Sequence, residues 1–464
     1  MNLKNIPIVV AKNIGRTKHA ISRFSAVILI AIICVAVIGS VFVLSYYYRN
    51  TAPNSSQTQA TTTTYTAFQP IPNLGNGTWQ FEENNLHVYN YSWNGTIATF
   101  NVTVGASVIV PPTLYDGLLL VDLSKNSTSG GVAAINVQNG QMVWNTILPN
   151  MMMTQPLIYE NLVIVGLGNN NFKEIGAGTS VRGNGTNYVA ALNFLTGKIV
   201  WTFPTDGEDM PTPLIYNGLV IGANGNAIVY ALNPLTGKEV WNAALPTGSF
   251  VSMSSPALLG DSIYFGANDP YTFYSVNVTD GKISWSTPIP ASAGGLDDCS
   301  PVIWNDVVIS GYTMWTSTGL MEPVLFAMNT TNGNILWQFN ETAGAEPPAI
   351  QVPPVTVWNG IVYSDPTEGG TLYAVNASNG ALLWNFNTGG DNSNVNIFDG
   401  NLWMVNTTGT LFVLNATTGT LLKTTNIGVP MGPGNVIFAG QNVIISGTNG
   451  QVISIPISNI YPSD

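Results

Sequence analysis

The sequence predicts an all-β fold: an eight-bladed β-propeller of four-stranded antiparallel blades, preceded by one N-terminal transmembrane helix. A motif ending in Gly-x-x-x-Trp occurs in six copies, with a seventh copy that lacks the Trp, at spacings of 39 to 57 residues. Such spacings are typical of propeller blades. Before most copies lie two short apolar runs separated by an Asn/Asp-Gly-type turn, which supplies the other two strands of a blade. A seven-bladed ring with irregular extra strands is the alternative.

The composition favours a packed core over a disordered chain. Only 8% of the residues are charged and 45% are hydrophobic, the reverse of a disordered composition. The two cysteines, Cys34 and Cys299, lie far apart, so no disulfide framework can be deduced. We expect Cys299 to be buried, because a free thiol is unusual on an exposed surface.

The first 48 residues predict a membrane anchor. Residues 1–23 form a basic segment without acids, and residues 24–48 are apolar and uncharged, long enough to span a bilayer as a helix. The excess of positive charge before the apolar segment predicts a cytoplasmic N-terminus and an external ring. A cleaved secretory signal is the alternative, but its apolar core is usually shorter. Residues 18–22 also resemble archaeal prepilin-type signals, in which residues before the apolar segment are removed and the segment is kept.

A stalk and glycosylation sites are predicted next. Residues 49–75 are rich in Thr, Ser and Pro without hydrophobic periodicity, and residues 76–464 form the predicted ectodomain. Sequons occur at Asn54, Asn76, Asn90, Asn94, Asn101, Asn126, Asn184, Asn277, Asn329, Asn340, Asn376, Asn406 and Asn415. On an external chain, this density predicts a glycoprotein.

The charge balance argues against a nucleic-acid partner. After Asn50 only seven Lys or Arg residues remain, against all 24 acids of the chain. A surface with so few cations cannot replace the counterions of a nucleic acid. The expected partners are the membrane and proteins or glycans of the cell envelope.

Each copy of the repeat has a physical interpretation. An alternating apolar strand ends at an Asn, an Asn-x-x-x-Gly turn follows, and a second strand carries the Trp. The Trp is bulky enough to pack against the neighbouring blade. The structural tryptophans are Trp144, Trp201, Trp241, Trp285, Trp337 and Trp384, while Lys423 replaces the seventh.

The ends of the repeat region predict a composite last blade. Residues 434–457 supply three strands but no Trp strand, and residues 94–104 resemble an isolated outer strand, with Thr99 at the Trp position. Pairing the two segments closes the ring without an open edge.

The motif Asn-x-x-(Thr/Asn/Asp)-Gly-x-(Ile/Leu/Val)-x-Trp resembles the pyrroloquinoline quinone (PQQ)-like propeller repeat family, over about residues 95–457. The resemblance implies the fold but not one activity, since the family includes quinoprotein dehydrogenases, assembly scaffolds and surface proteins without quinone. The dehydrogenases use PQQ with Ca²⁺, a catalytic Asp and typically an adjacent Cys–Cys disulfide. This chain has no Cys-Cys pair, so we expect no cofactor, with PQQ and Ca²⁺ or another metal as the alternative.

A candidate rim at the channel mouth is predicted from the connections between blades. It combines carboxylates with thioethers, and its members are Met151, Met152, Met153, Asp206, Glu208, Asp209, Met210, Met253, Asp297, Asp298, Cys299, Glu341, Glu346, Asp391 and Met431. Carboxylates could hold Ca²⁺, and Met with Cys299 could hold Cu(I) or contact a protein. Alternatively, the acids are solvated loop residues and the methionines fill irregular space.

The sequence therefore predicts a binding or scaffolding module of the cell envelope, without assigned catalytic residues. A metal- or PQQ-dependent oxidoreductase and a surface protein that captures solutes or glycans are the alternatives. His87, the only histidine after the apolar segment, cannot form a Ser-His-Asp or multi-histidine site alone. A surface of amides and hydroxyls depends little on ionised carboxylates, which with the prepilin-like start suggests an archaeon from an acidic habitat.

Overall fold

The computed structural model describes residues 96–461, apart from 177–178, 247–248, 269, 291, 318–320, 342–354, 367–369, 391–393 and 432–435. All described residues belong to the second of two units of the chain, Gln69–Asp464. None of the helices in the described part is long and apolar enough to cross a membrane. The predicted anchor, the stalk and His87 lie outside the described residues.

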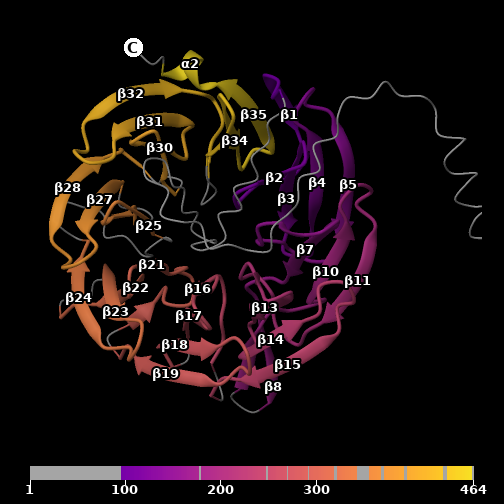
Figure 1. The fold of residues 1–464 in the computed structure, drawn as a ribbon, viewed down its shortest axis with the longest axis vertical. Coiled ribbons are helices and arrows are strands. Elements are labelled where there is room, and N and C mark those ends of the chain that lie inside the picture. The colour runs from indigo at the N-terminus through magenta and orange to yellow at the C-terminus, as the bar shows by residue number, and fades with distance from the viewer. Residues whose placement is uncertain are drawn as a thin grey trace, which may run out of the picture. The chain divides into compact units, whose positions relative to one another are not determined.

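Eight sheets are arranged around a common centre in the described part of the chain (Figure 1). Every sheet is antiparallel, and in seven of them the strands follow one another from the centre outward. The predicted eight-bladed propeller is confirmed, and the seven-bladed alternative is excluded. In the outer strand pair of each of these seven blades, the register shifts by a bulge beside the position of the repeat Trp.

The first four blades have short inner strands and longer outer ones. Their strands are β2 (Thr113–Tyr115), β3 (Leu118–Asn126), β4 (Ser129–Asn136) and β5 (Met142–Leu148); β6 (Leu157–Tyr159), β7 (Leu162–Leu167), β10 (Tyr188–Asn193) and β11 (Ile199–Pro204); β12 (Leu214–Tyr216), β13 (Leu219–Ala223), β14 (Ile228–Leu232) and β15 (Glu239–Ala244); and β16 (Ala257–Leu259), β17 (Ser262–Ala267), β18 (Thr272–Asn277) and β19 (Ile283–Pro288). A separate hairpin of β8 (Phe172–Gly176) and β9 (Thr179–Arg182) is inserted between β7 and β10.

The remaining blades follow the same plan, with one extra strand and one short helix. Their strands are β20 (Ser292–Gly294), β21 (Val302–Trp304), β22 (Val307–Trp315), β23 (Met321–Asn329) and β24 (Ile335–Asn340); β25 (Thr356–Trp358), β26 (Ile361–Ser364), β27 (Thr371–Asn376) and β28 (Leu382–Asn387); β29 (Asn396–Phe398), β30 (Asn401–Val405), β31 (Thr410–Asn415) and β32 (Leu421–Asn426); and β33 (Ile437–Ala439), β34 (Asn442–Ser446), β35 (Gln451–Pro456) and β1 (Phe100–Thr103), with α2 (Ile457–Ile460) at the end.

The Asn-x-x-x-Gly segments form the predicted turns. In the first copy, the Asn136 side-chain oxygen accepts the Gln138 N–H at 2.8 Å, and the Gly140 N–H donates to the Asn136 carbonyl at 2.8 Å. The turn glycines of all seven copies have φ between +66° and +72°. A side chain rarely tolerates this backbone conformation, so glycine is required at the position.

The repeat tryptophans join neighbouring blades. The indole nitrogen of Trp144 donates to the Phe194 carbonyl of the next blade at 2.9 Å, and that of Trp285 donates to the Thr330 carbonyl at 2.9 Å. Each ring also covers the turn glycine of the next blade, where an added Cβ would lie within 3 Å of the indole. The hydrophobic clusters likewise extend from one blade into the next. The core is therefore a series of blade-to-blade interfaces.

The composite blade closes the ring as predicted, but one residue was assigned wrongly. β1 pairs with β35 through Phe100 and Ser454, although the two strands lie at opposite ends of the described chain. Phe100, not Thr99, occupies the Trp position: its side chain covers Gly140, where an added Cβ would lie 2.5 Å from the Phe100 Cβ. The ring is thus closed by an aromatic residue.

The antiparallel strands divide the connections between two faces. One face, here called the loop face, carries the connections between consecutive blades and those between the second and third strands of each blade, including the β8–β9 hairpin. The opposite face, here called the turn face, carries the short turns and the Asn-x-x-x-Gly turns. The extended strands β22 and β23 and the extra strand β20 also end at the loop face.

Candidate functional site

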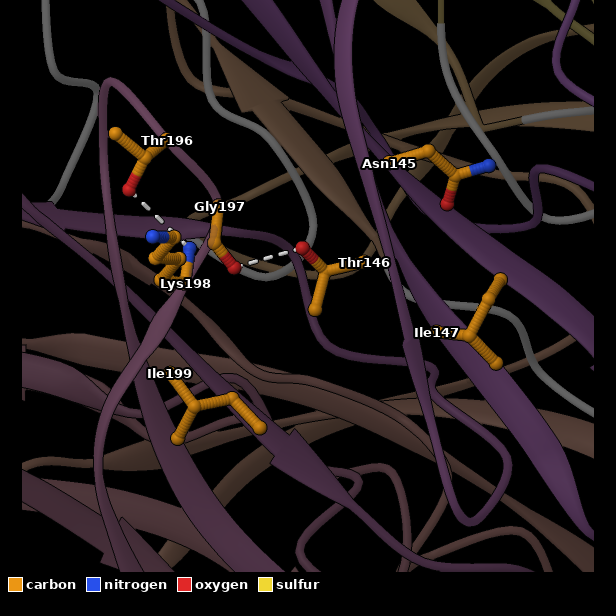
Figure 2. Close-up of a pocket in the computed structure, with 7 residues that line it drawn as sticks. All are labelled: Asn145, Thr146, Ile147, Thr196, Gly197, Lys198 and Ile199. Carbon is orange, nitrogen blue, oxygen red and sulfur yellow. Dashed lines mark hydrogen bonds between the residues drawn. The ribbon is translucent and has the colours of Figure 1, made fainter.

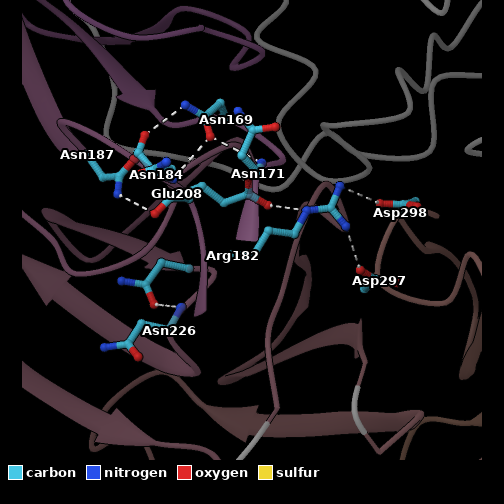
Figure 3. Close-up of polar contacts among 11 residues, drawn as sticks. Asn169, Asn171, Arg182, Asn184, Asn187, Glu208, Asn226, Asp297 and Asp298 are labelled. Atoms are coloured by element: carbon cyan, nitrogen blue, oxygen red, sulfur yellow. Dashed lines mark hydrogen bonds and ion pairs between the residues drawn. The ribbon is translucent and has the colours of Figure 1, made fainter. Parts of the chain in front are cut away.

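The β8–β9 hairpin is held over the loop face by a network of asparagines. The Asn150 amide donates to the Thr186 carbonyl at 2.9 Å, and the Asn169 amide donates to the Asn184 carbonyl at 2.7 Å. The Asn169 and Asn150 side chains also meet at 2.9 Å. Figure 3 shows Asn169, Asn171, Asn184 and Asn187 close to one another and to Arg182 of the hairpin. These hydrogen bonds join neutral amides, so they do not depend on the protonation of a carboxyl group.

Arg182, the last residue of the hairpin, reaches carboxylates from two other connections (Figure 3). Its Nε lies 3.0 Å from Glu208 Oε1, its Nη1 3.4 Å from Asp297 Oδ2, and its Nη2 3.9 Å from Asp298 Oδ1. Glu208 lies between β11 and β12, whereas both aspartates lie between β20 and β21. We call these four residues the Arg182 cluster. It links three parts of the ring through a single guanidinium.

Two aromatic rings pack against the same guanidinium. Its Cζ lies 5.9 Å from the centre of the Phe172 ring and 6.0 Å from that of Phe250. The two rings also contact each other edge-to-face at 5.4 Å. Aromatic faces attract a cation and exclude water from it. Only 13% of the Arg182 side chain is exposed.

Close backbone packing fixes Glu208 in place. Its N–H donates to the Arg182 carbonyl at 2.8 Å, and its carbonyl accepts the Gly225 N–H at 2.8 Å. A Cβ on Gly168 would lie 2.2 Å from the Glu208 Cβ, so only glycine permits this approach. The Glu208 side chain is fully buried. Its carboxylate therefore has little freedom to turn away from Arg182.

Burial shifts all three carboxyl groups of the cluster toward their protonated forms. It raises the pKa of Glu208 well above its ordinary value, and the opposing effect of Arg182 is smaller. For Asp297, burial and then the charge of Asp298 raise the pKa to about 8. Burial also raises the pKa of Asp298, against the effect of Arg182. A single guanidinium does not compensate for the dehydration of three carboxylates.

Asp209 and Glu341 are also buried carboxyl groups in connections of the loop face. Asp209 accepts the Tyr230 hydroxyl at 3.0 Å and a hydrogen bond from Thr205, and burial raises its pKa to about 7. Burial raises the pKa of Glu341 to about 8, with a smaller opposing effect of Ser364. Neither pKa is influenced by a basic side chain.

The structure brings together only part of the predicted rim. Glu208, Asp297 and Asp298 meet at Arg182, whereas Asp206 is exposed to solvent. Glu346 and Asp391 lie outside the described residues. Burial of Cys299, in the interface with the blade of β25–β28, is confirmed.

The methionines of the rim do not form one cluster. Met152 and Met431 are buried in two separate hydrophobic clusters, and Met210 is buried as well. Met151, Met153 and Met253 are partly exposed. The placement of Met152 and Met431 favours the interpretation of these residues as packing under irregular loops.

The sequons within the described residues differ in accessibility. Asn101, Asn126, Asn184 and Asn340 are exposed, and Asn277, Asn329, Asn376 and Asn415 are partly exposed. Asn406 is only 5% exposed, and its side-chain oxygen accepts the N–H groups of Thr408 and Thr410. Asn54, Asn76, Asn90 and Asn94 lie outside the described residues. Glycosylation stays a prediction, and within the described residues the four exposed asparagines are the most accessible positions.

A depression of about 470 Å³ lies away from the Arg182 cluster (Figure 2). It is open to solvent and lies between β5 and the turn that follows β10, where the Thr146 hydroxyl donates to the Gly197 carbonyl at 2.7 Å. Lys198 is its only charged lining residue. The depression is part of the repeated blade contact and provides no set of groups for chemistry.

The described residues do not provide a metal–quinone site. No group of three or more His, Cys, Asp or Glu side chains is arranged there to hold a metal ion. The carboxylates of the loop face that meet instead surround Arg182. Among the described residues, the donor set that these carboxylates form is therefore matched to the guanidinium of Arg182.

Sequence reasoning missed Arg182, which the repeat places in an insertion between two strands. One signal could have found it: Arg182 is the only arginine after Arg49. A lone arginine among so many acids is a candidate site residue, because a guanidinium pairs well with carboxylates and other oxyanions.

These features define the class of the protein: an eight-bladed propeller whose blades are joined by the Trp–Gly contact and whose loop face carries a buried charge cluster. The family model described as outer membrane protein assembly factor BamB, PQQ_2, matches residues 174–316 and 322–459. This is more than half of the chain, which therefore belongs to this family of PQQ-like propellers.

The individual proteins that match the chain share less than a third of its residues over the matched parts. Tetrathionate hydrolase of Acidithiobacillus ferrooxidans is 29% identical over 266 residues, which is 54% of this chain and 52% of that protein. The chain thus matches about half the length of this relative. BamB of Moraxella catarrhalis has a TM-score of 0.57 at 15% identity, covering 77% of this chain and 99% of that chain. Quinohemoprotein alcohol dehydrogenase of Comamonas testosteroni has a TM-score of 0.57 at 13% identity, covering 78% and 76%. Both structural similarities concern the fold alone.

Proposed function

We propose that the protein is a membrane-anchored, extracellular binding module of the cell envelope, and that its loop face receives a small solute. One observation carries this proposal: the departures from the repeat gather on one face. The β8–β9 hairpin, β20, the extended β22 and β23, and the Arg182 cluster all belong to the loop face. Function in rigid scaffolds concentrates in such loops.

The proposed location rests on the sequence before the ring. The apolar residues 24–48 follow a basic segment, which favours an anchor with its N-terminus inside. Alkaline extraction and external proteolysis of intact cells test this location. The expected result is that the chain stays in the membrane pellet and is cut from outside. Release of the chain by alkali, or protection of the ring in intact cells, would contradict it.

Tetrathionate is the first solute to test, because the relative that matches half of the chain is a tetrathionate hydrolase. The purified full chain is titrated with tetrathionate in a calorimeter at about pH 3, and tetrathionate loss is followed in the same samples. Saturable binding is expected, and turnover would make the protein an enzyme. Neither heat nor loss of tetrathionate from a folded sample would reject this solute.

A scaffold for envelope proteins is the second candidate. The family description favours it, and so do three large apolar side chains exposed near the loop face: Phe172, Ile175 and Trp315, each more than half exposed. Cross-linking in intact envelopes is the test, comparing the wild-type chain with Trp315→Ser. Loss of one defined cross-linked protein in the variant is expected for a scaffold, and identical cross-linking patterns would contradict a role of this surface.

A further inference from the structure

The Arg182 cluster is unbalanced in charge. Three carboxyl groups face one guanidinium, so the cluster carries a net charge of −2 when all are ionised and +1 when all are protonated. The guanidinium itself stays protonated at every accessible pH. Since 87% of its side-chain surface is hidden from water, a cation left without a counter-charge here is costly.

Acid removes the counter-charges that the protein itself supplies. The buried carboxyl groups of Glu208, Asp297 and Asp298 have raised pKa values, so they take up protons earlier than exposed acids do as the pH falls. Once they are neutral, Arg182 is balanced by no charge of the cluster. The cation must then be hydrated or paired with an anion from solution.

Among the described residues, Arg182 forms no ion pair besides these three. Phe172 and Phe250 cover the guanidinium without charge, and Lys173 and Glu174 of its own hairpin are exposed. Asp209, next to Glu208 in the chain, is directed to Thr205 and Tyr230.

One side of the cluster is suited to receive an anion. The Nη2–Asp298 contact is the longest of the three, at 3.9 Å, and both side chains keep 13% of their surface exposed there. Ser252 is fully buried and lies close enough to Glu208 and Asp298 to lower the pKa of each. Nevertheless, no atom among the described residues meets its hydroxyl with hydrogen-bond geometry. A hydroxyl and a guanidinium edge are the donors that an oxyanion requires.

We propose that the Arg182 cluster is a binding site for a sulfur oxyanion, occupied by its own carboxylates in alkaline solution and opened when they take up protons. The ligand must keep its charge in strong acid, at about pH 3, where ordinary carboxyl groups are protonated as well as those of the cluster. Sulfate and sulfonate groups keep their charge there, whereas carboxylates do not. Tetrathionate belongs to this ligand class, because its two ends are sulfonates. Only the role of tetrathionate rests on the proposed function.

The test uses the full chain in detergent and sulfate as the probe, in a chloride background. Calorimetry at about pH 3 and about pH 9 should show one sulfate site at the lower pH, with affinity reduced roughly 100-fold at the higher pH, because proton and anion binding are coupled. Arg182→Gln should lose the site at both pH values. Lys238→Gln, an exposed cation at a turn of the opposite face, is the matched control and should bind like the wild type.

A second variant keeps the test decisive if Arg182→Gln folds poorly. The triple variant Glu208→Gln, Asp297→Asn, Asp298→Asn imitates the protonated cluster, so it should bind sulfate at about pH 9 as the wild type does at about pH 3. Sulfate binding that is equal in the wild type and Arg182→Gln would mean an adventitious ion only. No sulfate binding by the folded wild type at about pH 3, or failure of the triple variant to gain binding, would also overturn the proposal.

Hydrogen exchange of the backbone amides distinguishes anion binding from the alternative in which water hydrates Arg182 in acid. If β8 and β9 lose protection in acid and sulfate does not restore it, the cation is hydrated and the inference fails. Tetrathionate binding that survives in Arg182→Gln would keep the proposed function and overturn this site. Sulfate binding without any tetrathionate binding would keep the site and reject tetrathionate as the solute.

Discussion

At the scale of single residues, the turn glycines carry the contact between blades. Gly333 has φ +69°, and an added Cβ would lie 2.4 Å from the Trp285 ring. Gly400 has nearly the same φ, +72°, but nothing lies within 4 Å of its added Cβ. This pair separates the cost of the backbone conformation from the cost of steric contact.

Gly333→Ala should lower the free energy of unfolding more than Gly400→Ala does. The backbone term is about 1 kcal/mol for both, and overpacking against the indole adds roughly 1–3 kcal/mol to the first. Urea denaturation of the two variants beside the wild type measures the difference. Equal losses would show that the Trp–Gly contact does not contribute to stability.

Some residues could be predicted from the sequence because the repeat fixes their surroundings. The Gly N–H of every turn donates to the carbonyl of its Asn, and each repeat Trp lies against the turn glycine of the next blade, so one copy explains the others. Arg182 occurs once, in an inserted hairpin, and its partners come from connections that no repeat aligns. Likewise, the burial of Met152 and Met431 depends on packing that composition does not contain.

At the scale of elements, β1 determines whether the ring is closed. Its alternating exposure places Phe100 toward Gly140 and Asn101 toward solvent. The sequence predicts this closure, but the prediction of Thr99 at the Trp position is wrong. A one-residue shift in a strand reverses the faces of all its side chains, and this strand lacks the turn that sets the register elsewhere.

Phe100→Ala should destabilise the ring by about 2–3 kcal/mol, less than a fully buried Phe→Ala because the side chain is partly exposed. Asn101→Ala on the same strand is the control and should change stability by less than about 0.5 kcal/mol. Thermal unfolding of unglycosylated protein measures both. A Phe100→Ala chain as stable as the control would show that the last blade does not need its aromatic contact.

At the scale of the whole molecule, buried carboxyl groups predict greater stability in acid than in alkali. The pKa values of Asp209, Asp297 and Glu341 are raised to about 7, 8 and 8. Between about pH 4 and 8 the folded chain therefore holds protons that the unfolded chain has released. Raising the pH through this range lowers the free energy of unfolding. The stabilisation that these bound protons provide is fully present below about pH 4.

The melting temperature should accordingly be higher at about pH 4 than at about pH 8, and Glu341→Gln should reduce the difference. Asp206→Asn, the removal of an exposed acid, is the control and should leave the pH profile unchanged. Melting curves of the wild type and both variants, recorded from about pH 4 to about pH 8, measure the difference. A melting temperature that falls from pH 8 to pH 4 would contradict both this prediction and the expected adaptation to an acidic habitat.

The composite blade also sets the order of events during synthesis. β1 is the first strand of the ring to leave the ribosome, and its partner β35 is the last. At translation rates of about 5–20 residues per second, β1 waits for on the order of tens of seconds with its backbone unpaired. Closing contacts such as Ser107 to Thr448 span 341 residues, so the loop entropy of the whole ring opposes them. Throughout that interval the unpaired backbone of β1 remains open to strands of other chains, which makes the period before release the time of greatest risk of aggregation.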